Sequence, residues 1–242
     1  MAEVVISERL RALCNMVTPG RTVVDVGCDH GFVSIYLVQR GISPSVLAMD
    51  VRTGPLSRAK EHIAEYGLTE YISTRLSDGL MEFKDGEAQS LICAGMGGRL
   101  MTKILTDSRE KAKNLQELIL QPQSELPEFR RFLKTEGYEL IDENILYEEG
   151  KYYFLMKVRY SGQSDVAMET TDGNTNILQE KYGEFLLERR NPVLKAYLEE
   201  TLQNMEQIAN GLESNDNERA RNRLIEIREE VGYLKQTLAL FS

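Results

Sequence analysis

The sequence has no tryptophan, and only two histidines and three cysteines among its 242 residues. The cysteines, Cys14, Cys28 and Cys93, lie far apart and none belongs to a C-x-x-C pair. The number is odd and the spacing irregular, so the sequence does not indicate a disulfide framework. We therefore expect free thiols in a reducing compartment, and no bound metal.

Long apolar runs are also missing, since no stretch approaches the roughly 18–20 residues of a membrane-spanning helix. Residues 1–16 alternate polar and apolar side chains and carry acids early, at Glu3 and Glu8, unlike a signal peptide. Hydrophobic residues make up 42% and charged residues 28% of the chain, as in ordinary globular proteins with a core. We expect a cytoplasmic protein without membrane contact.

The chain also lacks a positive net charge, and carries a net charge of −9 at pH 7. That balance argues against binding of nucleic acid by bulk charge. Up to Tyr160 there are 20 basic and 23 acidic residues, and after it 9 and 15, giving net charges of −3 and −6. Most of the excess acid therefore lies in the tail, and local basic patches remain compatible with the first part.

Short β-type runs alternate with helical stretches over residues 1–160. This alternation predicts βαβ units and a parallel sheet, and a closing hairpin adds antiparallel strands at one edge. Five parallel strands with a terminal hairpin form the α/β pattern of the Rossmann-like class I methyltransferase fold. The expected strands are residues 22–26, 46–49, 71–76, 90–94, 117–120, 138–147 and 152–160, and the expected helices are 7–17, 31–40, 56–66, a helix ending near 105, and 126–136.

Residues 161–176 are polar and lack periodicity, so we interpret them as a linker to a C-terminal domain, residues 177–242. In that domain apolar residues recur every seven positions in two seams, with turn-like residues 214–217 between them. The pattern predicts an antiparallel coiled-coil hairpin, and the alternative is a helical subdomain without a supercoil. The seams are Leu194, Thr201, Ile208 with Leu198, Met205, Leu212, and Leu224, Val231, Leu238 with Ile227, Leu234, Phe241.

The segment DVGCDHG, residues 25–31, closes the first strand and opens a helix. Its spacing is similar to the D-x-G-x-G-x-G loop of S-adenosylmethionine enzymes, with Asp29 at the usual middle glycine, and the dinucleotide fingerprint G-x-G-x-x-G is absent. Asp29 would repel a pyrophosphate but can accept a hydrogen bond from an ammonium group, which favours S-adenosylmethionine over NAD. The alternative is a turn without a ligand. The candidate cofactor-binding residues here are Asp25, Gly27, Cys28, His30 and Gly31.

Other candidate cofactor residues follow the next strands, at the edge where an open α/β sheet binds its ligands. Asp50 ends the second strand, where an acid can accept hydrogen bonds from both ribose hydroxyls. Asp78 follows the third strand, within reach of an adenine amine, and glycines follow the fourth. The alternatives are capping residues and ordinary turns. The candidates are Asp50, Val51, Asp78, Gly79, Gly95, Met96 and Gly97.

Substrate contacts are expected from the end of the fifth strand and from basic residues. The Gln121 amide could bind a base edge or cap a turn. Basic clusters could line an electropositive groove, or simply be solvated helix faces. The main candidates are Arg9, Arg11, Gln121, Pro122, Arg130 and Arg131, and further clusters contain Arg52, Arg58, Lys134, Arg219, Arg221 and Arg223.

Two further motifs are missing. The N/D-P-P-Y/F motif of many amino-methyltransferases is absent, which argues against the usual methylation of an exocyclic amine. No Pro-Cys pair is present, so Cys28 and Cys93 do not match the nucleophile of cytosine methylation, and we interpret them as small structural residues.

Together DVGCDHG, the Asp50 strand end, SDGL (residues 77–80), ICAGMGG (92–98), LILQP (118–122) and GKYY (150–153) resemble the bacterial TrmK family. The resemblance runs in order through residues 1–160, while the tail fits by pattern only. It implies a tRNA (adenine-N1)-methyltransferase acting at adenine 22, with S-adenosylmethionine as cofactor, tRNA as partner and a coiled-coil C-terminal domain.

Adenine N1 has an in-plane lone pair in the neutral base, so such a reaction depends mainly on positioning and electrostatics. We expect Asp29 to be the catalytic carboxylate that stabilises the cationic product or accepts a proton from N6; alternatively, it only binds the cofactor's ammonium group. The other hypotheses are a methyltransferase for a small molecule or protein, a catalytically idle cofactor-binding scaffold and, less favoured, an NAD enzyme. We expect a monomer or weak dimer.

Overall fold

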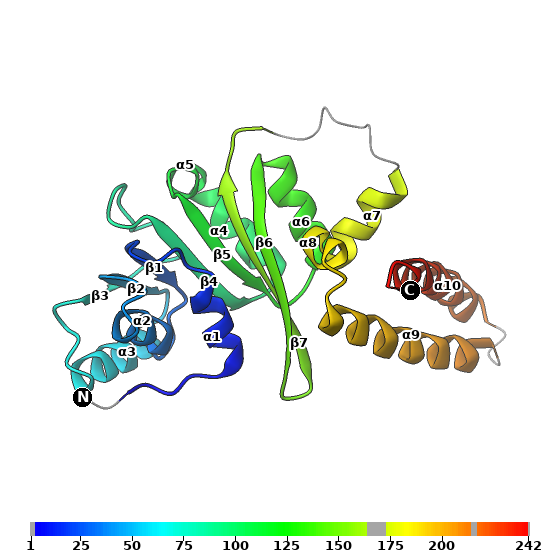
Figure 1. Ribbon diagram of the computed structural model, residues 1–242, viewed down its shortest axis with the longest axis horizontal. Coiled ribbons are helices and arrows are strands. Elements are labelled where there is room, and N and C mark those ends of the chain that lie inside the picture. Colours follow the sequence, from blue (N-terminus) through cyan, green and yellow to red (C-terminus); the bar gives the residue numbers. More distant parts are fainter. Residues whose placement is uncertain (1–2, 164–172, 214–216, 242) are drawn as a thin grey trace. The chain divides into compact units, whose positions relative to one another are not determined.

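The computed structural model describes residues 3–163, 173–213 and 217–241 (Figure 1). The chain forms two compact units, one up to Met168 and one from Glu169. This boundary falls within the expected linker, residues 161–176, most of which lies outside the described residues.

The first unit is built on a seven-stranded sheet of order β3-β2-β1-β4-β5-β7-β6. The first five strands are parallel, and the hairpin of the last two is antiparallel to β5, which confirms the predicted Rossmann-like methyltransferase fold. The strands are β1 (Val23–Val26), β2 (Val46–Asp50), β3 (Ile72–Leu76), β4 (Ser90–Met96), β5 (Glu117–Pro122), β6 (Tyr138–Glu148) and β7 (Lys151–Tyr160). Strand β4 extends two residues beyond its expected end, so Gly95 and Met96 belong to the strand.

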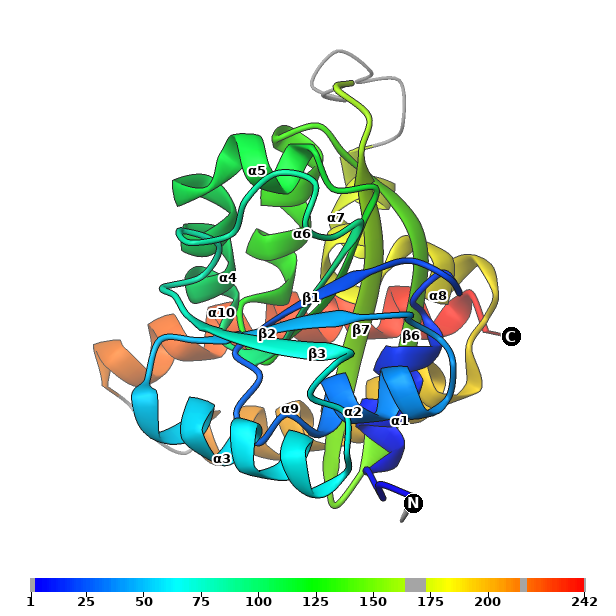
Figure 2. The ribbon, with the colours of Figure 1, turned by 90° about the vertical axis from the view of Figure 1, so that its left-hand side faces the viewer.

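Helices cover both faces of this sheet (Figure 2). One face carries α1 (Glu8–Asn15), α2 (Phe32–Gln39) and α3 (Thr53–Glu65), and the other carries α4 (Gly98–Asp107), α5 (Arg109–Lys113) and α6 (Leu126–Thr135). The short helix α5 was not expected from the sequence. Helix α3 begins three residues earlier than expected, with Pro55 in its first turn, where proline needs no hydrogen-bond partner.

The alternation of side chains along β1 builds both halves of the core. Val24 and Val26 pack into the cluster under α4 to α6, while Val23 packs into the cluster under α1 to α3. Side chains two residues apart share a face of a strand, so Asp25 points to the same side as Val23, toward α2. This places one carboxyl group in an otherwise apolar layer, where Ser34 of α2 donates a hydrogen bond to it.

The second unit contains α7 (Gly173–Tyr182), α8 (Glu184–Glu188), α9 (Pro192–Glu213) and α10 (Glu218–Ala239). Two ion pairs, Glu206–Lys235 and Glu213–Arg228, both 2.7 Å long, show that α9 and α10 run antiparallel. Asn217 begins α10 by accepting a hydrogen bond from the Ala220 amide. The other residues of the expected turn, 214–216, lie outside the described residues.

Two expectations for this unit need correction. Helix α7 already begins at Gly173, so the last four residues of the expected linker are helical. The seams are buried only in part, because Leu194, Leu198, Ile227 and Leu234 are buried whereas Ile208 is 51% exposed. Helices α7 and α8 contribute buried side chains as well, so the unit is a small helical bundle, and its supercoiling remains a prediction.

Candidate active site

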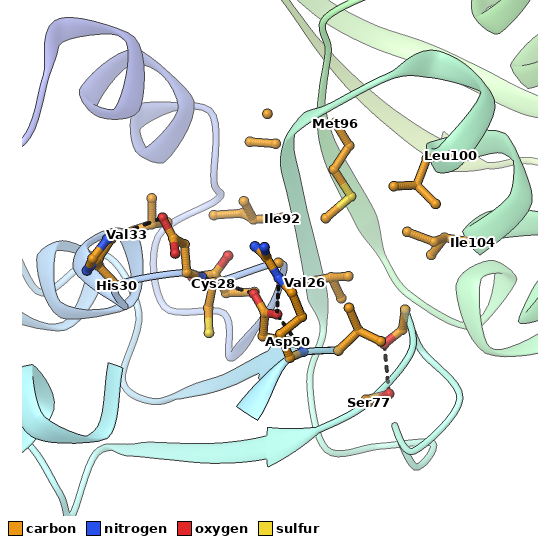
Figure 3. A pocket seen from close by; sticks show the side chains of 18 of the residues that line it. Val26, Cys28, His30, Val33, Asp50, Ser77, Ile92, Met96, Leu100 and Ile104 are labelled. Carbon is orange, nitrogen blue, oxygen red and sulfur yellow. Dashed lines mark hydrogen bonds and ion pairs between the residues drawn. The ribbon is translucent and has the colours of Figure 1, made fainter. Parts of the chain in front are cut away.

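A cavity of about 570 Å³ opens at the carboxyl ends of β1, β2 and β4 (Figure 3). This is the edge of an α/β sheet at which ligands bind, and the size suits a small molecule. The predicted residues that line it are Arg9, Asp25, Gly27, Cys28, Asp29, His30, Asp50, Val51, Asp78, Gly79, Gly95 and Met96. The predicted residues Gly31, Gly97, Arg11, Gln121, Pro122, Arg130 and Arg131 do not line it.

The turn after β1 requires glycine at Gly27. Its φ is +77°, and a Cβ placed on it would lie 2.2 Å from the Met96 Cε. The Gly27 and Cys28 amides both donate to the Met49 carbonyl, at 2.8 and 3.0 Å, which ties the turn to β2. Gly31 has φ +74° and faces Ala59 of α3, so it serves helix packing rather than the cavity wall.

Asp29 occupies the left-handed region, with φ +46°, which aspartate tolerates better than most residues. Its amide donates to Asp50 Oδ2 at 3.4 Å. Its carboxylate is 56% exposed at the cavity, 3.6 Å from both Arg58 Nη2 and His30 Nε2. This conformation turns the carboxylate away from the core and leaves it accessible to a ligand.

Asp50 is 5% exposed and ends β2 beside the turn. Its Oδ1 accepts a hydrogen bond of 2.9 Å from the Arg52 amide, and its Oδ2 accepts the bond from Asp29. Two backbone donors thus fix the orientation of this carboxylate. The Ser77 amide donates to the Asp50 carbonyl at 2.9 Å, which joins the ends of β2 and β3 in the cavity wall.

Asp25 is 3% exposed and accepts a 2.7 Å hydrogen bond from Ser34 Oγ. Burial raises the pKa of Asp25 to about 6; the Ser34 bond opposes the shift and the charge of Asp50 adds to it. The cavity floor therefore holds a carboxyl group that changes its charge close to neutral pH.

The cavity has apolar walls, of which the sequence interpretation named Met96 but missed Val33, Leu100 and Ile104. Met96, Leu100 and Ile104 lie on the side of β4 and α4, and Val33 lies near His30 on the opposite side (Figure 3). For Val33 and Leu100 the signal was available, because both are apolar residues in the first turn of a helix that follows a parallel strand, at the edge of the sheet where ligands bind.

Arg9 of α1 reaches the end of β5. Its Nη1 donates to Gln121 Oε1 at 2.8 Å, its backbone amide donates to Glu148, and its guanidinium lies 5.1 Å from the centre of the Tyr153 ring. Gln121 is completely buried, and its Oε1 also accepts from the Gly95 amide at 3.2 Å. The expected contact of Gln121 with a base is therefore wrong for this conformation, and buried Pro122 offers no such contact either.

The basic residues expected to contact the substrate differ in how deeply they are buried. Arg130 is 8% exposed and pairs with buried Glu143 at 2.9 Å, so its expected place on an RNA-binding surface is wrong. Its guanidinium serves the packing of α6 against β6 instead. Arg11 and Arg131 are exposed on α1 and α6.

Both cysteines near the site are buried, and burial raises the pKa of Cys28 and, to about 12, that of Cys93. Neither thiol is ionised at neutral pH, which does not suit a nucleophile. Within the described residues no group of three or more His, Cys, Asp and Glu side chains could hold a metal ion, and no helix is long and apolar enough to cross a membrane.

Comparisons with known proteins agree with this geometry. A methyltransferase-domain family matches residues 6–156. The Bacillus subtilis (strain 168) tRNA (adenine(22)-N(1))-methyltransferase is 32% identical over 98% of this chain and 99% of its own length. The solved structure of Bacillus subtilis TrmK, an M1A22 tRNA methyltransferase, superposes with a TM-score of 0.83 at 31% identity, covering 98% of this chain and 100% of that one.

A Streptococcus pneumoniae protein solved in complex with S-adenosyl-L-methionine has a TM-score of 0.79 at 29% identity, with 97% of this chain and 100% of that chain covered. The similarity therefore spans both units and extends beyond the methyltransferase domain alone. The Bacillus subtilis relative is similar over nearly the whole of both chains, and the family model matches the domain that contains the cavity. This chain therefore belongs to the TrmK family of tRNA (adenine(22)-N(1))-methyltransferases.

Proposed function

We propose that the protein transfers a methyl group from S-adenosylmethionine to N1 of adenine 22 in tRNA, as the name of its Bacillus subtilis relative states for that enzyme. The observation that carries the proposal is the turn of residues 25–31, which brings Asp29 beside Asp50 at the mouth of the cavity. A dinucleotide enzyme would need room for a pyrophosphate at this turn, where Asp29 instead presents a negative charge.

The residues fit S-adenosylmethionine. Gly27 leaves a cradle that a Cβ would fill, and Asp50 offers an oriented carboxylate for the two ribose hydroxyls. Asp78 is exposed at the cavity for an adenine amine, and Val51 supplies an apolar surface for the base. The carboxylates of Asp25 and Asp29 give the cavity the negative charge that an ammonium and a sulfonium group require.

When bound, S-adenosylmethionine supplies an electrophilic methyl group. The neutral adenine already carries a lone pair on N1, so no side chain has to remove a proton first. The protein's contribution is to orient the base, exclude water and stabilise the positive charge that the base acquires. The apolar wall of Met96, Leu100 and Ile104 excludes water, and carboxylates stabilise the charge.

We assign the catalytic role to Asp29. Like Asp78 it is exposed at the cavity, but it belongs to the turn after β1, whereas Asp25 and Asp50 are buried and hydrogen-bonded. Arg58 Nη2 lies 3.6 Å from the Asp29 carboxylate, and this carboxylate stabilises the methylated base or accepts a proton from N6.

The tRNA partner has to approach a chain of net charge −9 through local basic surface. The candidates in the first unit are Arg52, which lines the cavity, Arg58, which lies 3.6 Å from Asp29, and Arg11 and Arg131, which are exposed on α1 and α6. Arg219, Arg221 and Arg223 at the start of α10 are those in the second. We further propose that the protein acts in the cytoplasm, as a monomer or weak dimer.

The test is transfer of labelled methyl from S-adenosylmethionine to bulk bacterial tRNA, followed by nucleoside analysis. We expect 1-methyladenosine with the wild type. Asparagine and glycine both adopt the left-handed backbone conformation of this position, so neither Asp29→Asn nor Asp29→Gly should disturb the turn. Both should lower the transfer rate roughly 100-fold while the affinity for S-adenosylmethionine is retained.

Asp85→Asn, at an exposed aspartate remote from the cavity, is the matched control. If the Asp29 variants lost affinity for S-adenosylmethionine by the same factor as they lost transfer rate, Asp29 would be a binding residue only. Absence of incorporation into any tRNA, with cofactor binding intact, would overturn the substrate and favour a small-molecule or protein substrate, or an idle scaffold.

A further inference from the structure

Two loops at the carboxyl end of the sheet are tied together beside the cavity. The Gln123 amide, just after β5, donates to the Met96 carbonyl at 2.8 Å, and the Gly98 amide donates to the Ser124 carbonyl at 3.2 Å. A Cβ on Gly98 would lie 2.5 Å from the Ser124 carbonyl oxygen, so the close approach depends on glycine. The backbone that carries Gln123 is therefore fixed relative to β4.

The side chain of Gln123 has a different environment from its backbone. It is exposed and lines the cavity, and its Nε2 lies 3.8 Å from the position of a Cβ on Gly95. Within the described part of the chain its carboxamide makes no hydrogen bond. Gly95 has φ +75° and no side chain, which leaves this carboxamide open space at the mouth of the cavity.

Gln121, two residues earlier, is in the opposite situation. Its Oε1 is shared between Arg9 and the Gly95 amide, and its side chain is completely buried. One glutamine thus holds the strand end in place, and the other presents unused hydrogen-bonding groups to the cavity.

Methylation at N1 restricts how a protein can recognise adenine. A hydrogen bond to N1 would occupy the lone pair that reacts, so the edge of the base with both a donor and an acceptor that stays free is the one formed by the N6 amine and N7. A carboxamide matches this edge, because its oxygen accepts from N6 and its NH₂ donates to N7. Among the side chains that line the cavity, Gln123 is the only carboxamide in the described residues.

The other polar side chains of the cavity do not match this pattern. Asp29 can only accept, and Arg9 and Arg52 can only donate. His30 has a donor and an acceptor nitrogen, but the two diverge on opposite sides of the ring and cannot bind N6 and N7 of one base together. The Ser77 hydroxyl is buried and already donates to the Gly79 carbonyl at 2.9 Å.

We propose that Gln123 is a specificity-determining residue, whose carboxamide binds the N6 and N7 edge of the target adenine and leaves N1 facing the methyl donor. This inference rests on the proposed adenine-N1 methylation. It adds a contact with the substrate base that neither Gln121 nor Asp29 provides.

The experiment compares wild type and Gln123→Ala on two tRNA substrates, one with adenine and one with 7-deazaadenine at position 22. The second base lacks the N7 acceptor but keeps N1 and N6. We expect kcat/KM of the wild type to be roughly 10-fold lower on the 7-deaza substrate. Gln123→Ala should be roughly 10- to 100-fold slower on adenine, and its ratio of kcat/KM between the two substrates should lack the roughly 10-fold preference for adenine that the N7 contact gives the wild type.

Comparing ratios removes the effect of 7-deaza substitution on the reactivity of N1, because both enzymes experience it equally. Gln116→Ala is the matched control, since Gln116 is exposed at the opposite end of β5. Its substrate discrimination should equal that of the wild type, and Gln123→Ala should bind S-adenosylmethionine like the wild type.

Unchanged discrimination in Gln123→Ala would overturn the inference, as would a loss confined to cofactor affinity. Failure of the proposed function would look different, because the wild type would then bind S-adenosylmethionine but form no 1-methyladenosine on either tRNA.

Discussion

Arg9 Nη1 lies 2.8 Å from Gln121 Oε1, so a helix at the start of the chain is bonded to the end of the fifth strand. The same oxygen accepts from the Gly95 amide at 3.2 Å. One buried carboxamide therefore connects α1, β4 and β5 at the mouth of the cavity. Arg9 and Gln121 are positioning residues for the Gly95–Met96 segment, which forms part of the cavity wall.

Replacement of Gln121 by Leu should weaken this connection without a large change in volume. The Gly95 amide and the Arg9 guanidinium lose their acceptor, which should lower the free energy of unfolding by about 1–3 kcal/mol. We expect kcat for tRNA methylation to fall roughly 10-fold, with a smaller change in the KM for S-adenosylmethionine. Denaturant unfolding and steady-state kinetics measure the two effects.

Asn15→Ala is the control for this prediction, because Asn15 lies on the same helix, is exposed and does not line the cavity. A Gln121→Leu enzyme with wild-type kcat and stability would show that the connection has no functional role.

Asp25→Asn should make the protein more stable at alkaline pH. The folded state holds the Asp25 proton up to about pH 6, whereas the unfolded chain releases it near its ordinary pKa of 3.8. The free energy of unfolding therefore falls as pH rises through this window, and the buried charge costs about 1–3 kcal/mol above it. Asparagine is neutral and can still accept the Ser34 hydrogen bond.

Unfolding experiments at pH 4 and pH 8 should show the variant close to wild type at the lower pH and more stable at the higher. Asp85→Asn, at an exposed site, should give no such pH dependence. A difference of equal size at both pH values would mean that Asp25 does not titrate in this range. We also expect weaker binding of S-adenosylmethionine by Asp25→Asn, since the cavity loses a negative charge.

Glu117 anchors the opposite end of the sheet. Burial by itself raises the pKa of Glu117, but hydrogen bonds from Thr18, Ser90 and Lys157 outweigh it and hold the pKa below its usual value. This stabilisation is present above the unfolded pKa and is lost as pH falls through the folded one.

Glu117→Gln should lower the free energy of unfolding at pH 7 by about 2–4 kcal/mol, because it leaves Lys157 and Arg21 without their carboxylate. Glu139→Gln removes an exposed pair with Arg159 and should cost less than about 1 kcal/mol. Equal losses in the two variants, measured by urea unfolding, would contradict the assigned role of Glu117.

The strands and turns that form the site could be predicted from the sequence, because the backbone conformation at each of them is determined mainly by the residues of that segment itself. Gly27 needs a positive φ at a strand end, and Asp50 follows a run of buried β-forming residues. The exceptions were contacts between distant segments. Arg9 and Gln121 are 112 positions apart, and neither residue type signals that one satisfies the other.

The same limit explains the error at Arg130. A basic cluster on an amphipathic helix predicts a solvated face, and only the approach of β6 reveals that Glu143 neutralises the arginine in the interior. Gln123 was missed for a related reason. Its role depends on the lack of a side chain at Gly95, 28 positions earlier in the sequence.

Binding of tRNA by a chain of net charge −9 should depend steeply on salt, since it relies on a few local basic side chains. We expect the dissociation constant to increase by at least roughly tenfold between 50 and 200 mM salt, while that for S-adenosylmethionine changes little. Fluorescence anisotropy with labelled tRNA measures the first and calorimetry the second. A salt-independent tRNA affinity would contradict electrostatic binding.

The most direct measurement of the central claim is primer extension on a single tRNA transcript after incubation with the protein and S-adenosylmethionine. A methyl group on N1 blocks the Watson–Crick face, so a new stop should appear immediately before adenine 22, and a transcript with guanine at that position should show none. Stops at another adenine would contradict the assigned position. Methyl incorporation without any stop would contradict transfer to N1.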